Sequence, residues 1–428
     1  MTYSQDLSAC FSEDNEQRFD RGSFRPWLDK ATEAVDWLRE VYSKGEMELL
    51  KLPESREGFD DWRTIASAWR ENFTDIVVLG AGGASLGGQS LCAVGYDQPG
   101  PRMHFLDNLS PAKLDWALRV LDPETTAAIA ISKSGATSQT LAQASVIFEW
   151  LSEAVSPEHL FEQAVVITED QKNNPLRLLS ERAQIIALDH PTAIGGRYSV
   201  LSVVGLLPAL LSGLDIEAVR KGAQEALEKA VHCPKIENNA VAMGAALSIA
   251  FEKEKATASS VLMTYAEKLT AFGQWHRQLW AESLGKEGHG TTPSPAVGTV
   301  DQHSQLQLYL EGTADKWFTF IREDTRGQGY DIPSQWLQPQ QMDYLRNRTL
   351  GDMFYAEGQS TIETLVARGR PVRVFEIDRV DETTVGGLFM HFMLETILAA
   401  RLLGVNAFDQ PAVESGKTLT RHYLREMN

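Results

Sequence analysis

The stretch Ile129–Thr140, IAISKSGATSQT, decides the fold of this 428-residue chain. Residues 126–131 are apolar and partly β-branched, which is typical of a strand buried in a parallel sheet. A small polar loop follows at 132–137, and an apolar face then repeats at helical spacing over 141–151. Free N–H groups at the start of such a helix, beside hydroxyls and a lysine, predict an anion site, although an ordinary Ser- and Gly-rich turn stays open. The polar side chains of this loop are Ser132, Lys133, Ser134 and Thr137.

On both sides of this stretch, short apolar runs alternate with helical segments. Five runs fall between residues 75 and 190: DIVVLG, MHFLD, TAAIAIS, AVVITE and QIIALD. After a charged helical region, three more follow: SSVLMTYAE, DKWFTFIRE and VRVFEIDRV. This alternation predicts an α/β fold of two lobes, each with a mainly parallel sheet flanked by helices. We expect an N-terminal helical segment at 1–55, a first lobe at 56–214 and a second lobe at 215–428 that ends in a helix.

The composition and charge of the chain limit the kinds of molecule that the protein can bind. The chain is 43% hydrophobic and 23% charged, as is usual for a soluble globular protein, and its net charge is -18. That charge argues against nucleic acid and anionic membranes as partners, but allows an anionic substrate in a locally positive site. Three scattered cysteines, a polar N-terminus and a longest apolar run of 200–214 predict a reduced, cytoplasmic protein with no signal peptide and no membrane span. The cysteines are Cys10, Cys92 and Cys233, and their spacing does not suggest a metal site.

A glycine-rich turn, GAGGASLGG, follows the first run. Gly82 and Gly83 would let the backbone approach a ligand closely. The turn loosely resembles a dinucleotide-binding loop, but its third glycine is out of register and an acidic ribose partner is not evident. A nicotinamide enzyme therefore stays open with little support.

Two further residues could do chemistry at strand and helix ends. Arg197 follows two glycines, where it could stabilise developing negative charge or simply tie down a loop. Glu282 ends a helical face that contains Trp275 and Trp280, and partial desolvation by that apolar patch would suit a base. A solvated glutamate at a helix end is the alternative.

The remaining candidates lie further along the second lobe. We expect Asp301 to cap a helix over 302–310, with His303 in its first turn, either exchanging protons or serving structure. Gln410 and Lys417 are seven residues apart, which is two turns on one helical face if a helix starts at Pro411.

Taken together, these stretches resemble the glucose-6-phosphate isomerase family in its compact bacterial form. The specific motifs are GGRYSVLS, WAESLGKEG, DQHSQLQL and DQPAVESGK, which follow the SKSGAT loop in that order, so the resemblance extends from Gly80 to Lys417. It implies two flavodoxin-like sugar-isomerase lobes, a homodimer, a sugar phosphate substrate, and neither a metal nor an organic cofactor.

The resemblance also implies a role for each candidate. The loop at 132–137 would hold the phosphate, and Glu282 would move a proton between C1 and C2. Arg197 would face the enediolate, His303 and Lys417 would open the sugar ring, and Gln410 would support them. In this family the histidine comes from the neighbouring subunit.

The chain departs from the family pattern in places, and two other functions stay open. Ala84 stands where the family usually has Ser, with Ser85 one position later, and Gln139 replaces a usual Glu. A bifunctional enzyme would also take mannose 6-phosphate, but it tends to carry a smaller hydroxyl residue at Gln410. A non-catalytic sugar-phosphate-binding protein would not need Glu282 together with the other catalytic candidates.

Overall fold

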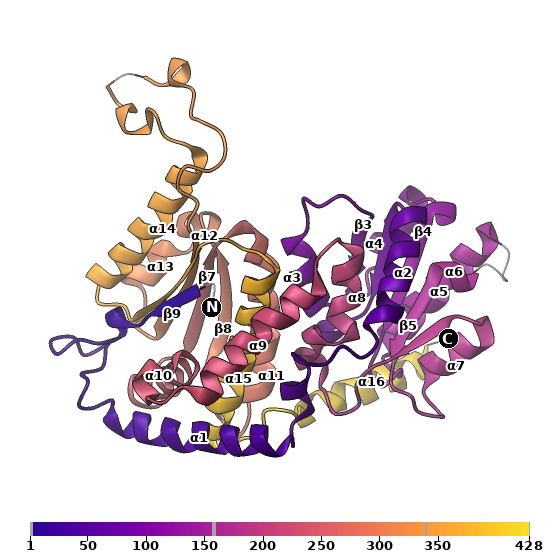
Figure 1. Ribbon diagram of the computed structural model, residues 1–428, viewed down its shortest axis with the longest axis horizontal. Coiled ribbons are helices and arrows are strands. Elements are labelled where there is room, and N and C mark those ends of the chain that lie inside the picture. The colour runs from indigo at the N-terminus through magenta and orange to yellow at the C-terminus, as the bar shows by residue number, and fades with distance from the viewer. Residues whose placement is uncertain (1–2, 156–159, 339, 428) are drawn as a thin grey trace.

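Two parallel-stranded sheets stand side by side in the computed structural model, which describes residues 3–155, 160–338 and 340–427 (Figure 1). The first sheet has the order β3-β2-β4-β5-β6, with every neighbouring pair parallel. Its strands are β2 (Asp75–Leu79), β3 (Arg102–Leu106), β4 (Thr126–Ile131), β5 (Ala164–Thr168) and β6 (Ile186–Asp189). The α/β fold class and all five predicted runs of this lobe are confirmed.

Helices cover both faces of this sheet, so β2, β4 and β5 are buried along their whole length. The helices are α2 (Phe59–Asn72), α3 (Leu86–Val94), α4 (Pro111–Val120), α5 (Ser138–Ala154), α6 (Leu160–Gln163), α7 (Pro175–Ala183) and α8 (Val203–Leu211). The chain runs from β2 outward to β3 and then returns to the other side of β2 as β4. Strand order therefore reverses beside β2, which is where ligands bind in open α/β sheets.

The second sheet has the order β1-β10-β9-β7-β8. Four strands are parallel: β7 (Ser259–Tyr265), β8 (Thr292–Val297), β9 (Lys316–Glu323) and β10 (Val372–Ile377). β1 (Tyr3–Asp6) adds an antiparallel edge on β10. The sequence did not predict β1 or β8. β8 contains Pro293 and Pro295, which read as breakers but are tolerated because β8 is an edge strand.

Most of the remaining helices lie around this sheet, whereas α16 extends along the first lobe (Figure 1). The remaining helices are α1 (Arg25–Lys44), α9 (Ile216–His232), α10 (Ala240–Glu254), α11 (Thr270–Leu284), α12 (Val300–Ser304), α13 (Leu306–Glu311), α14 (Leu350–Ala367), α15 (Glu382–Leu403) and α16 (Glu414–Glu426). In the described part of the chain, α15 is the one helix long and apolar enough to cross a bilayer, but 89% of its most apolar window is buried in the protein.

Several local expectations need correction. α1 stops at Lys44, before the end of the predicted helical segment, because Gly45 adopts a left-handed φ of 62°. Residues 196–201 form a 3₁₀ turn, and Ser202 caps α8 by accepting the N–H of Val204. The segment 1–55 is not wholly helical, since β1 joins the second sheet and α1 packs on α10 and α15. The boundary at 214 stays a prediction, and the outermost residues 1–2 and 428 of the predicted segments lie outside the described ones.

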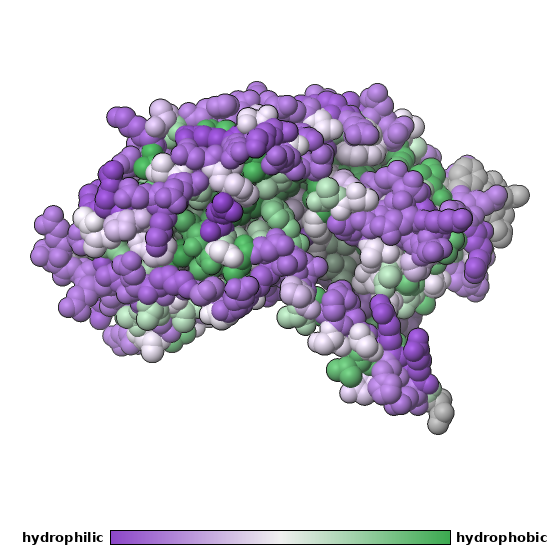
Figure 2. All heavy atoms as spheres, turned by 90° about the horizontal axis from the view of Figure 1, so that it is seen from below, coloured by the Kyte–Doolittle hydropathy of each residue, from purple (hydrophilic) through white to green (hydrophobic). Residues whose placement is uncertain are grey.

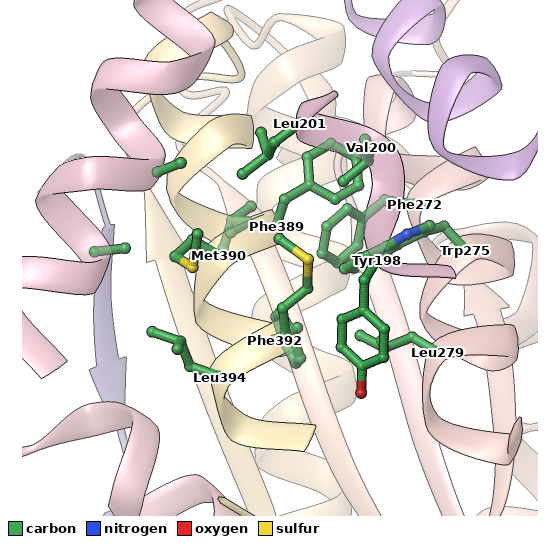
Figure 3. Packing of buried hydrophobic residues seen from close by; sticks show 14 of the residues in the cluster. Tyr198, Val200, Leu201, Phe272, Trp275, Leu279, Phe389, Met390, Phe392 and Leu394 are labelled. Atoms are coloured by element: carbon green, nitrogen blue, oxygen red, sulfur yellow. The ribbon is translucent and has the colours of Figure 1, made fainter. Parts of the chain in front are cut away.

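A continuous apolar core joins the two lobes and fixes the elements that carry chemistry. In Figure 3, aromatic side chains from the 3₁₀ turn at 196–201, from α11 and from α15 pack together. Trp275 meets Phe389 edge to face with ring centroids 4.6 Å apart, and Phe272 lies 5.6 Å from Phe392. Because a close-packed core resists deformation, α11 and the 3₁₀ turn are held in a fixed relation.

Candidate functional site

A cleft of about 830 Å³ opens at the carboxyl ends of β2 and β4. The glycine turn after β2, the polar loop after β4, the Arg197 turn, the end of α11 and the segment 408–421 all contribute to its lining. The lining includes each predicted site residue except Gly82 and His303. Segments from five separate parts of the sequence thus meet at the reversal of strand order.

The polar loop presents hydroxyls at the start of α5. Ser132 Oγ donates to Thr137 Oγ1 at 3.0 Å, and the N–H of Ala136 donates to Ser134 Oγ at 3.3 Å. Gly135 has a φ of 63°, and a Cβ there would collide with the side chain of Asn174, so this turn requires glycine. In the described part of the chain the side chain of Thr137 does not cap α5, so the first N–H groups of that helix remain available to an anion.

Lys133 lines the cleft, but its ammonium group binds to other groups of the protein. Its Nζ donates to the carbonyl of Thr192 at 2.7 Å and lies 3.7 Å from Glu169 Oε1. The lysine therefore ties the polar loop to the loop after β6 while adding charge nearby. His190, which the sequence did not suggest, also lines the cleft, and burial lowers the pKa of its imidazole to about 4.

Backbone contact, more than side chains, defines the glycine turn. A Cβ at Gly83 would collide with the backbone of Gly196, so glycine allows the two turns to touch. Gly82 has a φ of 57° and lies beneath the amide of Gln278, outside the cleft lining. Ala84 does line the cleft, whereas Ser85 is fully buried and accepts from Gln89 Nε2 at 2.8 Å. The hydroxyl of Ser85 thus does not replace the one missing at Ala84.

Arg197 is 3% exposed and every N–H of its guanidinium has a partner. Nε donates to Ser283 Oγ at 2.9 Å, and Nη1 donates to Glu282 Oε2 at 3.2 Å and to Gln410 Oε1 at 2.8 Å. Nη2 donates to the carbonyls of Ala407 at 2.6 Å and Asp409 at 3.0 Å. Arg197 thus ties down the segment after α15 and also faces the candidate base, while its role toward a charge on the substrate stays a prediction.

Glu282 lies one residue before the buried end of α11 with its carboxylate facing polar neighbours. Oε2 accepts from Arg197, and Oε1 accepts from Gln278 Nε2 at 2.9 Å. The apolar patch expected beside it is not its main surrounding, since Trp275 Nε1 donates to the carbonyl of Arg197 and Trp280 Nε1 donates to Thr291. These indoles fix α11, and the side chain of Glu282 keeps an exposure of 33%.

Gln278 is a site residue that the sequence reasoning missed. It lines the cleft one turn before Glu282, and a helical i, i+4 relation to a proposed base was the signal that could have found it. Its Oε1 is buried and has no hydrogen-bond partner among the described residues.

Gln410 and Lys417 both line the cleft, but the expected helix between them starts later. Residues 411–413 form a 3₁₀ turn, and α16 begins at Glu414, so the two side chains do not share one helical face. Lys417 Nζ lies 2.7 Å from Glu414 Oε1. Every described residue of α16 is exposed, and Figure 2 shows this helix as a column that stands out from the body at the lower right.

His303 is placed differently from the expectation. Thr299 stands at the N-cap position of α12 without a side-chain capping bond, and His303 falls in the last turn of that five-residue helix, because Asp301 lies inside the helix and uses its carboxylate there. That carboxylate accepts from the N–H of Val297 at 2.7 Å and from Gln305 Nε2 at 2.9 Å. His303 is exposed and lies outside the cleft lining, so one chain does not bring it to its own Glu282.

Comparison with known proteins shows the family. The family model described as phosphoglucose isomerase matches residues 56–335. Glucose-6-phosphate isomerase of Rubrobacter xylanophilus is 37% identical over 380 residues, 87% of each chain, and that of Thermus thermophilus is 37% identical over 383 residues, 88% of this chain and 89% of the other.

Solved structures agree on the fold. A hypothetical protein from Thermus thermophilus has a TM-score of 0.87 at 32% identity, with 99% of each chain covered. A glucose-6-phosphate isomerase from Chlamydia trachomatis has a TM-score of 0.80 at 19% identity, covering 100% of this chain and 89% of that one. The chain belongs to the phosphoglucose isomerase family and is an aldose–ketose isomerase.

Proposed function

We propose that this enzyme interconverts glucose 6-phosphate and fructose 6-phosphate through a cis-enediol, as a cytoplasmic step of glycolysis and gluconeogenesis. The observation that carries the proposal is that Glu282, held by Arg197 and Gln278, shares one cleft with the uncapped start of α5. A carboxylate and an anion site in one cleft suit a substrate with a phosphate at one end and an acidic C–H at the other.

In the proposed route the phosphate binds at the polar loop, through the hydroxyls of Ser134 and Thr137 and the first N–H groups of α5. With the ring open, Glu282 removes the proton from C2, and the electron pair forms the C1–C2 double bond while the negative charge moves to O1. Arg197 stabilises this charge on the enediolate oxygens. The hydroxyl proton of O2 then passes to O1, Glu282 returns its proton to C1, and the carbonyl forms at C2. Each step is a proton transfer, so we propose neither a metal nor an organic cofactor.

Substrate scope is the first matter to test. Mannose 6-phosphate would give the same enediol after loss of its C2 proton, so a bifunctional enzyme is the alternative. Gln410 supports the narrower activity, since its Oε1 is held by Arg197 at 2.8 Å and its amide fills the cleft wall. A coupled assay with each sugar phosphate tests this directly. Turnover of glucose 6-phosphate alone supports the proposal, comparable turnover of both replaces it with the bifunctional enzyme, and binding without turnover leaves only a sugar-phosphate-binding protein.

We also propose a homodimer in which His303 serves the cleft of the neighbouring subunit. Two observations support this. His303 is exposed and outside its own cleft, and the arm at 324–349, of which residues 324–338 and 340–349 are described, projects from the second lobe in Figure 1. That arm carries three strongly exposed aromatic side chains within 15 residues of sequence, as an interface would: Tyr330 at 85%, Trp336 at 79% and Tyr344 at 69%.

Mixed dimers test the shared site. Glu282→Gln and His303→Ala are each expected to be nearly inactive, and the two variants are co-expressed so that subunits mix. If His303 acts across the interface, each mixed dimer has one doubly damaged site and one intact site. Since random mixing makes about half of the dimers mixed, about a quarter of wild-type activity should return. An absence of recovery, with mixed dimers verified by mass, would put His303 in its own subunit or outside catalysis.

A cytoplasmic location is proposed on the chemistry of the thiols. Cys10 and Cys92 are buried, Cys233 is half-buried, and all three are unpaired. Free cysteines suit a reducing compartment.

A further inference from the structure

We propose that Tyr265 is a positioning residue for His303, acting through Gln302 on the short helix α12. The inference rests on the proposed ring-opening role of His303 and extends it to a second layer of residues. Tyr265 is the last residue of β7, and the chain leaves the neighbouring strand β8 at Val297 to enter α12. The tyrosine therefore lies beside the point at which α12 begins.

The ring of Tyr265 is fully buried and held from two sides. A Cβ at Gly298, just before α12, would approach the ring to 2.5 Å, and a Cβ at Gly358 of α14 would approach it to 3.1 Å. Phe320 stacks on it with centroids 6.1 Å apart, and Phe354 lies at 5.7 Å. Glycines on both sides let the backbone close onto the ring, so the place of the hydroxyl is fixed by packing.

That hydroxyl points at the side chain of Gln302 on α12. Tyr265 Oη donates to Gln302 Oε1 at 2.6 Å and lies 2.9 Å from the hydroxyl of Thr361. Gln302 Nε2 in turn donates to Glu357 Oε2 at 3.2 Å, so the amide is fastened at both ends. Burial raises the pKa of Tyr265 to about 12, which keeps the phenol protonated as a donor.

The helix needs such an anchor because it has little stability of its own. A helix of five residues is too short to hold its shape by backbone hydrogen bonds, and the side chains of α12 are half-buried or exposed. Asp301 secures the same turn on its inner side through Val297, Ser304 and Gln305. Gln302 and Asp301 thus face the protein, while His303 next to them faces outward. Loss of the Tyr265 hydroxyl should leave the fold intact, but the side chain of His303 should no longer be held in one orientation.

The test uses Tyr265→Phe and Gln302→Ala in the full-length protein. Each should lower kcat by about fivefold to tenfold, the scale of one lost hydrogen bond, with inhibition by inorganic phosphate unchanged because the cleft of the first lobe is untouched. Gln302→Ala removes the same hydrogen bond without changing the buried tyrosine, so the test does not depend on whether Tyr265→Phe folds. Tyr3→Phe is the matched control, since Tyr3 is also buried and its hydroxyl lies 3.1 Å from His391, away from α12, and it should leave kcat unchanged.

A double-mutant cycle with His303→Ala separates positioning from a general effect. If Tyr265 acts through His303, adding Tyr265→Phe to His303→Ala should cost no further activity, whereas additive losses would overturn the proposal. This cycle is informative even if the shared-site model fails.

In mixed dimers, Tyr265→Phe should recover activity with Glu282→Gln to about a quarter of wild type and gain none with His303→Ala. If Tyr265→Phe recovers activity with both Glu282→Gln and His303→Ala, the positioning role is overturned. If Glu282→Gln mixed with His303→Ala recovers no activity, only the shared site is refuted.

Discussion

The guanidinium of Arg197 and the carboxylate of Glu282 form an ion pair of 3.2 Å although the residues stand 85 positions apart in the chain. The arginine is 2% exposed at its side chain and the glutamate 33%, so the pair sits at the boundary between the protein and the cleft. Because Arg197 also holds Ser283, Gln410 and two carbonyls, it fixes one carboxylate oxygen without depending on the glutamate for its own place. A proton acceptor held in this way can change protonation while its surroundings stay in position.

Replacing that acceptor should separate binding from chemistry. Glu282→Gln keeps the size of the side chain and removes its basicity, so turnover should fall by roughly 10²-fold or more. Inhibition by inorganic phosphate should persist, because the polar loop is unchanged. The control is Glu267→Gln, an exposed carboxylate just before the same helix, which should behave as wild type. Near-normal turnover of Glu282→Gln would mean that another group is the base.

Much of the fold could be predicted from the sequence because its signals are local. The buried parallel strands read as short apolar runs, and α15 reads as a helix that is apolar nearly all round and ends at Gly404 with a left-handed φ. The candidate anion site was also visible, since strand, polar loop and helix start are consecutive in the chain.

What the sequence could not give are relations between distant segments. Burial of Arg197 among five acceptors depends on where residues 407–410 cross the turn, which no local pattern encodes. The edge strand β8 was hidden by its prolines, and α12 was misjudged because Asp301 binds forward to Gln305 and back to Val297 at once. In the sequence, Gln278 is one polar residue of an amphipathic helix, and its hydrogen bond to Glu282 is visible only in the structure.

The hydroxyls of the polar loop should account for much of the phosphate affinity. Ser134→Ala combined with Thr137→Ala removes two donors to a charged group, so inhibition by fructose 6-phosphate and by inorganic phosphate should both weaken by about 10²-fold or more. Ser145→Ala is the control, because this exposed serine of α5 donates to the carbonyl of Leu141 outside the cleft. If inhibition by both anions is unchanged in the double variant, the phosphate binds elsewhere.

A buried histidine of α11 should make stability fall in mild acid. Burial lowers the pKa of His276 to about 4, and its ring stacks on Trp280 and meets Phe392 edge to face. The unfolded chain takes up this proton near pH 6.5 and the folded protein only near pH 4, so stability is lost as pH falls through that window. Between about pH 7 and pH 5 the loss from this group is about 2 kcal/mol. Urea unfolding of His276→Phe should show a pH dependence flatter by that amount, and equal slopes for both proteins would contradict the assignment.

The arm at 324–349 should control both assembly and activity. Truncating two of its exposed aromatics, in Trp336→Ala with Tyr344→Ala, should raise the dissociation constant of the dimer by at least about 10²-fold, since such side chains dominate interface energy. Sedimentation at several protein concentrations measures this directly. Because each cleft is proposed to borrow His303 from its neighbour, activity per subunit should fall on dilution of the variant at concentrations where wild type keeps its rate. Trp116→Ala on α4, 43% exposed on the other lobe, should change neither property. A variant that stays dimeric, or a monomer that retains full activity, would refute the arm as the interface or the shared site respectively.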